Sequence, residues 1–146
     1  MKPSEFFNEE EKTRIIRAIR DAERNTSGEI RLHIEGKCTG DVLDRSAYIF
    51  EHLGMHKTRL RNGVLFYLAV VNQKFAILGD AGINAVVPDN FWDGIKNMVL
   101  DHFKKGEFAE GLAKGIELAG EQLKKYFPYR QDDINELSDD ISFGSK

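Results

Sequence analysis

Hydrophobic and polar residues follow two different spacings along this sequence, one typical of helices and one typical of strands. Polar and apolar side chains alternate strictly in residues 29–35, whereas residues 63–71 and 74–78 are largely apolar runs of strand length. Apolar side chains recur every three or four positions in residues 9–24, 41–53, 89–105 and 108–127. The predicted order of elements is therefore helix, strand, helix, strand, strand, helix, helix.

Local signals mark where these elements begin and end. Asn8, Asp41 and Asp89 each stand where a predicted helix starts, and their side chains are good N-terminal caps. Residues 72–73 leave room only for a tight turn, so the two strands that flank them form a hairpin. The stretch from 80 to 88 is expected to be a loop.

The order of elements predicts the fold. A strand–helix–strand unit crosses over right-handed and makes its strands parallel, while the hairpin makes the third strand antiparallel to the second. We expect an α/β fold, a three-layer α/β/α sandwich with helices on both faces of a small mixed, mostly parallel sheet. Residues 1–128 are predicted to form this one domain. Residues 129–146 are predicted to be an acidic tail, mobile or draped over the surface.

Composition and charge narrow the functional classes. The 146 residues carry a net charge of −3, which gives no global attraction to nucleic acid. Cys38 is the only cysteine, so the sequence excludes an intramolecular disulfide and a multi-cysteine zinc site. The charged N-terminus lacks the apolar centre of a signal peptide, and no apolar run reaches the ~18–20 residues of a membrane span. We therefore expect a cytoplasmic protein without a membrane span.

The predicted topology brings separate segments to one edge of the sheet. The first two strands begin at this edge, and the antiparallel third strand ends there. The helix expected to start at Asp89 follows within one loop. The residues that this edge should collect are Ser27, Gly28, Glu29, Asn62, Gly63, Gly79, Asp80, Gly82, Asp89, Trp92 and Asp93.

This set of residues suits a divalent cation. Packed carboxylates repel one another, and a bound Ca²⁺ or Mg²⁺ relieves the repulsion with the oxygen ligands that hard cations prefer. Asp80 and Glu29 are the expected anionic ligands, Asn62 and backbone carbonyls are the neutral ones, and Asp93 or Asp89 is an accessory. Alternatively, these are ordinary turn residues, and Glu29 is the exposed member of an alternating strand.

A basic connection leads to the same edge. It contains Arg59 and Arg61, which are candidates for contacts to a phosphate group. In a metal-assisted phosphomonoesterase, the cation would polarise the phosphoryl oxygen while an arginine stabilises charge. The alternatives are a solvated connection for the arginines, and for Trp92 a place either in the core or along the pocket. Because no nucleophile or general acid stands out, binding of a ligand or protein partner ranks above catalysis.

Several segments resemble a known family in their spacing and order. They are "ERNTSGEIRLHI", "RNGVLFYLAV", "ILGDAGI", the helix with Trp92 and "GLAKGIELAGEQLKKYFP". From Asn8 to Pro128 the chain resembles the TPM domain family, which includes thylakoid lumen proteins linked to photosystem II repair and many bacterial proteins. It looks most like a stand-alone bacterial member.

The resemblance implies an α/β/α sandwich, divalent-metal binding and an acid phosphatase activity attributed to plant members. The positions that match the family are Ser27, Gly28 and Glu29, then Asn62 and Gly63, then Gly79, Asp80 and Gly82. Many members carry an export signal and a membrane anchor or glycine-rich tail. This sequence shows neither, and this departure from the family argues against a role tied to a membrane or an exported compartment.

Overall fold

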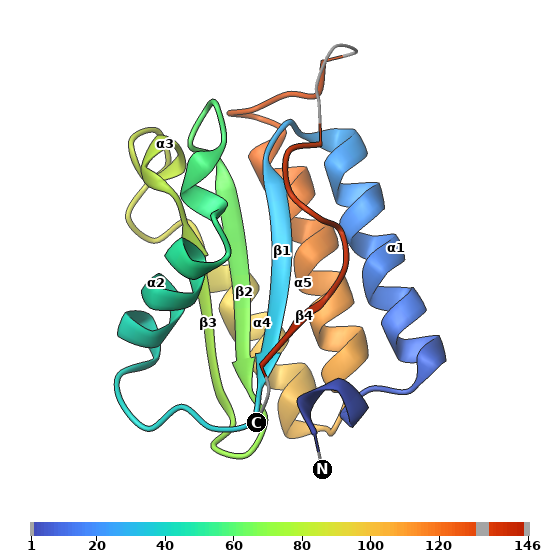
Figure 1. Cartoon of the computed structure of the whole chain (residues 1–146). Coiled ribbons are helices and arrows are strands. Elements are labelled where there is room, and N and C mark those ends of the chain that lie inside the picture. Colours follow the sequence, from blue (N-terminus) through green and yellow to red (C-terminus); the bar gives the residue numbers. More distant parts are fainter. Residues whose placement is uncertain (1, 131–134, 145–146) are drawn as a thin grey trace.

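The computed structural model describes residues 2–130 and 135–144, and these form one mixed sheet with helices around it (Figure 1). The strands run in the order β3-β2-β1-β4. β1 is parallel to β2 and to β4, while β2 is antiparallel to β3. The predicted α/β fold with its mostly parallel sheet is therefore confirmed. The strands are β1 (Glu29–Glu35), β2 (Gly63–Ala69), β3 (Lys74–Gly79) and β4 (Ser142–Phe143).

Helices cover both faces of the sheet unequally. In Figure 1, α1, α4 and α5 lie behind the sheet, and α2 lies across the front of it. No helix among the described residues is long and apolar enough to cross a membrane. The long helices are α1 (Glu9–Asn25), α2 (Val42–His52), α4 (Asp93–Lys104) and α5 (Phe108–Leu123), and the short ones are η1 (Pro3–Glu5), η2 (Met55–Lys57) and α3 (Ala81–Asn84).

The sheet separates two apolar cores. The larger core joins alternate residues of β1, such as Ile30 and Leu32, to side chains of α1, α4 and α5. The smaller core lies under α2, where Phe50 and Met55 pack against Leu65 of β2. Because successive strand residues point to opposite faces, both faces of β2 are buried, as its continuous apolar run predicted.

Four predicted boundaries are wrong, and one of them is the end of the last helix, which stops at Leu123 and not at residue 127. Asp89 does not cap a helix, because the turn bonds from Phe91 to Pro88 and from Asp93 to Asn90 delay the start of α4 to Asp93. The expected loop after β3 contains α3, which Asp80 caps. The second strand ends at Ala69 because residues 70–73 form the turn to β3.

The C-terminal segment belongs to the sheet. Ser142 and Phe143 pair with His33 and Ile34 of β1, and the amide of Gly144 donates to the carbonyl of Ile34 at 2.8 Å. Ile141 is 9% exposed, at the margin of the larger core. The sequence pattern predicted no strand here, because two paired residues are too few to show alternation.

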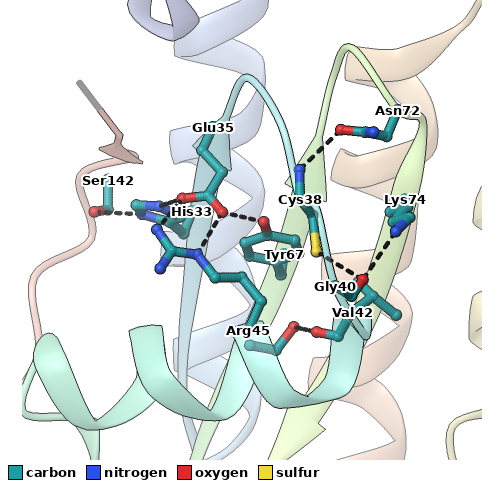
Figure 2. A network of polar contacts seen from close by, with 11 residues as sticks. His33, Glu35, Cys38, Gly40, Val42, Arg45, Tyr67, Asn72, Lys74 and Ser142 are labelled. Carbon is teal, nitrogen blue, oxygen red and sulfur yellow. Dashed lines mark hydrogen bonds and ion pairs between the residues drawn. The ribbon is translucent and has the colours of Figure 1, made fainter. Parts of the chain in front are cut away.

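A buried polar network fastens α2 and the C-terminal segment to β1 (Figure 2). Glu35 accepts hydrogen bonds from Nε (2.8 Å) and Nη2 (2.9 Å) of Arg45 on α2, and from the hydroxyl of Tyr67. Nε2 of His33 lies 3.3 Å from Glu35, and its Nδ1 lies 2.9 Å from the hydroxyl of Ser142. These contacts join four segments of the chain, so the network has a structural role.

The network also shifts the pKa values of His33 and Glu35. Burial lowers the pKa of His33 and outweighs the neighbouring carboxylate. Burial alone would raise the pKa of Glu35, but hydrogen bonds from Arg45, Tyr67 and His33 hold it below its usual value. The polar side of β1 is thus an internal surface. Glu29, His33 and Glu35 are all buried there.

Candidate functional site

Asp80 directly follows β3 and forms an ion pair with Arg61. Its carboxylate oxygens accept hydrogen bonds from Nε (2.8 Å) and Nη2 (2.9 Å) of that guanidinium. Oδ1 also accepts from the amide of Ala81 at 2.7 Å, which caps α3. Asp80 is only 7% exposed, so its charge needs a partner, and the bidentate guanidinium supplies one.

Arg61 adopts a backbone conformation that is uncommon for a residue with a side chain. Its φ is 52°, in the left-handed region, which costs roughly 1–2 kcal/mol for an L-residue. The ion pair with Asp80 holds the side chain, and the amide of Gly82 donates to the Arg61 carbonyl at 2.9 Å. A Cβ on Gly82 would lie 2.1 Å from the carbonyl oxygen of Leu60. Only glycine at position 82 therefore permits α3 to pack this closely against the loop before β2.

A pocket of about 410 Å³ opens beside the guanidinium, and we call it the Arg61 pocket. It lies between α2, the end of β3 and the loop before β2. Half of the Arg61 side chain is exposed there, whereas Phe50 is buried and Leu78 is half-buried. The residues of the pocket used below are Phe50, Glu51, His56, Arg61, Leu78 and Asp80.

A second pocket, of about 300 Å³, lies where β1 begins. Carboxyl groups reach it from three segments: Glu23 from α1, Glu29 from β1 and Asp139 from the C-terminal segment. Ser27 and Gly28 line the same pocket, as the predicted collection of residues at this edge requires. We call this the acidic pocket.

Two carboxyl groups of the acidic pocket, those of Glu23 and Glu29, have raised pKa values. Burial raises the pKa of Glu29 to about 7, although the amides of Glu136 and Leu137 donate to its Oε1. Burial raises the pKa of Glu23 to about 9, and the side chain of Asp139 adds to the rise by hydrogen bonding and charge. Protons thus occupy part of this pocket near neutral pH.

Glu29 and Asp80 lie at the same edge of the sheet but in different pockets. Gly63 of β2 stands between their strands, because it pairs with Glu29 on one side and its carbonyl accepts from the Asp80 amide on the other. A Cβ on Gly63 would lie 3.6 Å from both Leu137 and Phe50. Apolar side chains therefore cover Gly63, the residue that stands between the two strands.

The other predicted site residues differ in burial and in their contacts. Asn62 is buried, and its side chain donates to the carbonyl of Ser27 at 3.3 Å, so it joins the starts of β1 and β2. The backbone amide of Arg59 donates to the Glu136 carboxylate at 3.2 Å. Asp89 and Asp93 are exposed.

Trp92 belongs to the larger core. Its Nε1 and Cζ2 atoms lie 3.4 Å from the position that a Cβ of Gly79 would occupy. It packs beside the residues that cover the face of the sheet opposite α2. Of the two alternatives left open by the sequence, the core position is the observed one.

The two pockets differ in how well they suit a cation. Both oxygens of Asp80 are bound to Arg61, so the Arg61 pocket does not fit one. The acidic pocket offers three carboxyl groups, the ligand type that Ca²⁺ and Mg²⁺ prefer. Yet within residues 2–130 and 135–144 no three His, Cys, Asp or Glu side chains converge as metal ligands do. A cation there would have to draw the carboxyl groups together.

The sequence pattern missed Glu23 and Asp139. Glu23 follows Ile15 and Ile19 at intervals of four, so it lies on the stripe that α1 buries. An acidic residue on this buried stripe was the signal that could have identified Glu23. Asp139 had none, because its neighbours show no periodicity and its partner is 116 positions away along the chain.

Comparison with known proteins places this fold in a family. Residues 1–122 match the family model of the TPM domain. The NMR structure of the BA42 protein from the psychrophilic bacterium Bizionia argentinensis is 52% identical and superimposes with a TM-score of 0.92. That match covers 98% of this chain and 99% of the BA42 chain.

Two more distant NMR structures share the fold. The N-terminal domain of a P. gingivalis protein is 19% identical with a TM-score of 0.68, covering 88% of this chain and 84% of that one. The N-terminal domain of cg2496 from Corynebacterium glutamicum is 16% identical with a TM-score of 0.62, covering 91% and 78%. No curated protein matches the sequence. The match over most of the chain, together with the observed sandwich, shows that this protein belongs to the TPM domain family.

Proposed function

We propose that this TPM domain is a binding module for a divalent cation, Ca²⁺ or Mg²⁺, and that the cation is held in the acidic pocket. The observation that carries the proposal is the meeting of three carboxyl groups from α1, β1 and the C-terminal segment in one pocket. Of the ligands predicted from the sequence, Glu29 is kept. Glu23 and Asp139 take the places first given to Asp80 and Asn62.

The charge state of the pocket supports a cation. Glu23 and Glu29 have pKa values raised to about 9 and about 7, so the folded protein retains protons that exposed carboxyl groups would lose. A divalent cation would replace those protons and compensate the buried charge. Binding should therefore release protons, and affinity should rise with pH.

The position of the pocket gives the cation a mechanical role. Glu29 already accepts hydrogen bonds from the backbone amides of Glu136 and Leu137. Asp139 follows two residues later in the same segment. A cation between these groups would fasten the C-terminal segment to β1 and α1. The module would then present an ordered surface to a ligand or protein partner when the cation is bound.

Calorimetric titration with Ca²⁺ and with Mg²⁺ tests the proposal. We expect Glu29→Gln and Glu23→Gln to weaken binding by at least about tenfold. The matched control is Asp80→Asn, which alters a buried carboxylate of the other pocket and should leave the affinity unchanged. Titrations in two buffers with different ionisation enthalpies should reveal the released protons.

Two results would overturn the assignment. Equal affinities of wild type and Glu29→Gln would remove the acidic pocket from consideration. Loss of binding in Asp80→Asn with retention in Glu29→Gln would return the cation to the position first predicted from the sequence.

Metal-assisted phosphomonoester hydrolysis stays an untested prediction. The arginine predicted to contact the phosphate, Arg61, lies in a different pocket from Glu29. The arginines that line the acidic pocket are Arg20 and Arg24, and Nε of Arg20 already lies 3.8 Å from the Asp139 carboxylate. Binding of a cation thus has more support than catalysis.

A further inference from the structure

We propose that the Arg61 pocket is a second binding site, for a small organic carboxylate with an apolar body. This site is independent of the cation in the acidic pocket. The inference rests on the guanidinium held in one orientation, on the apolar side chains that line the same pocket, and on the local charge.

The guanidinium is held in one orientation. Asp80 engages the edge formed by Nε and Nη2, and this leaves the end formed by Nη1 and Nη2. Nη1 makes no hydrogen bond within the part of the chain that the structure describes, and half of the side chain is exposed. A carboxylate has the geometry to accept two parallel hydrogen bonds from that end. The donor is thus already ordered before a ligand arrives.

The backbone of Arg61 indicates that the side chain is placed for a reason beyond stability. Glycine would satisfy a φ of 52° without strain, and asparagine would do so at little cost. Among the described residues only Gln73, in the turn before β3, shares this property with Arg61 as a non-glycine residue. Strain that surrounding contacts maintain is characteristic of ligand sites.

Apolar side chains line part of the same pocket. Phe50 is 6% exposed and belongs to the smaller core, where Leu78 packs against it as a half-buried residue. An aromatic or aliphatic body would bury surface against these side chains. A volume of about 410 Å³ lies within the usual range of small-molecule pockets, roughly 300–1,000 Å³.

Local charge selects the head group. The charge of Asp80 offsets that of Arg61, and Glu51 adds a further carboxylate to the lining. Both acids repel an anionic ligand, and the repulsion of a phosphate dianion is about twice that of a carboxylate, which carries one charge. His56 completes the polar side, and its Nδ1 is buried without a hydrogen-bond partner in residues 2–130 and 135–144.

An NMR titration with phenylacetate tests the inference. We expect amide shifts confined to residues that line the Arg61 pocket. Benzylamine has a similar body and the opposite charge, and should cause no such shifts. Acetate lacks the body and should bind at least about tenfold more weakly, because a buried aromatic ring contributes more than 1.4 kcal/mol. Phenyl phosphate tests the head group and should bind more weakly than phenylacetate.

The decisive variant is Arg61→Gly combined with Asp80→Asn. Glycine relieves the strained φ, and asparagine keeps the oxygen that caps α3, so we expect a melting temperature at least equal to that of wild type. Phenylacetate affinity should fall at least about tenfold when a bidentate charged contact is lost. Glu29→Gln should bind phenylacetate as wild type does, which separates this site from the proposed cation site.

Three results would overturn the inference. The first is a folded double variant that binds phenylacetate like wild type. The second is a set of shifts that benzylamine reproduces or that lie away from the pocket. The third is tighter binding of phenyl phosphate, which would exclude the carboxylate as the preferred head group.

Discussion

The α-carbon of Gly82 lies so near the carbonyl of Leu60 that a Cβ on Gly82 would come within 2.1 Å of that oxygen. The contact joins the short helix α3 to the loop before β2. Both obstacles, Leu60 and Arg61, are backbone groups, so a side chain at this position cannot be accommodated by a change of rotamer.

Gly82→Ala should therefore destabilise the protein by about 1–3 kcal/mol, the usual cost of forcing an extra group into packed structure. Urea unfolding followed by circular dichroism measures the change. Gly94→Ala is the matched control, because a Cβ there meets nothing within 4 Å and the position is helical. That variant should be neutral or slightly stabilising. Equal effects of the two substitutions would contradict the contact.

Ile141→Ala should lower the free energy of unfolding by about 2 kcal/mol, because Ile141 is buried against the larger core. The same denaturation experiment applies. Val71→Ala is the control, since Val71 is 63% exposed and its truncation should change stability by less than about 0.5 kcal/mol. An Ile141 variant as stable as wild type would show that the C-terminal segment is not part of the fold in solution.

The contribution of His33 to stability should be lost as the pH drops below about 6.5. The unfolded chain takes up a proton at an ordinary histidine, while burial keeps the pKa of folded His33 lower. The contribution is therefore present above pH 6.5, the ordinary histidine value, and is lost as the pH falls towards the pKa of the folded state. The stability at pH 5 relative to that at pH 7 should therefore be higher for His33→Gln than for wild type.

Thermal unfolding across that pH range provides the measurement for His33. His52→Gln is the control substitution, because His52 is exposed at the end of α2. A His33 variant whose pH profile equals that of wild type would contradict the contribution of His33.

Tyr67→Phe should cost about 0.5–1.5 kcal/mol, the net worth of one hydrogen bond. The hydroxyl of Tyr67 donates a hydrogen bond to Glu35 inside the network (Figure 2). When the hydroxyl is removed, Glu35 keeps the two hydrogen bonds from Arg45. Tyr48 is 57% exposed, so Tyr48→Phe should change stability by less than about 0.5 kcal/mol. No difference between the two variants would mean that water replaces the bond without loss.

The sequence predicted the elements with strong periodicity and the edge where they meet. β1, β2 and β3 were found because apolar patterns report burial, and the right-handed crossover fixed their directions. The same reasoning brought Ser27, Gly28 and Glu29 to a pocket, although it expected them to share one with Asp80. Residue spacing therefore located the edge of the sheet, but it could not show that this edge holds two separate pockets.

What the pattern could not show was which group neutralises which charge. Asp80 and Arg61 both stood out as candidates, one for a cation and one for a phosphate, yet they bind each other. Their side chains meet because the left-handed backbone at Arg61 turns it towards β3, and periodicity carries no information about such a turn. The C-terminal segment escaped notice for a similar reason, because its contacts to Glu29 are made by backbone amides.

The course of the C-terminal segment along β1 has a consequence for self-association. It meets β1 at its start, through the amides given to Glu29, and near its end, through the pairs with His33 and Ile34. The segment therefore borders a sheet edge whose backbone groups would otherwise offer a template to another copy of the chain. A shortened protein that ends before residue 135 should oligomerise or precipitate, and a tag is better attached at the opposite terminus.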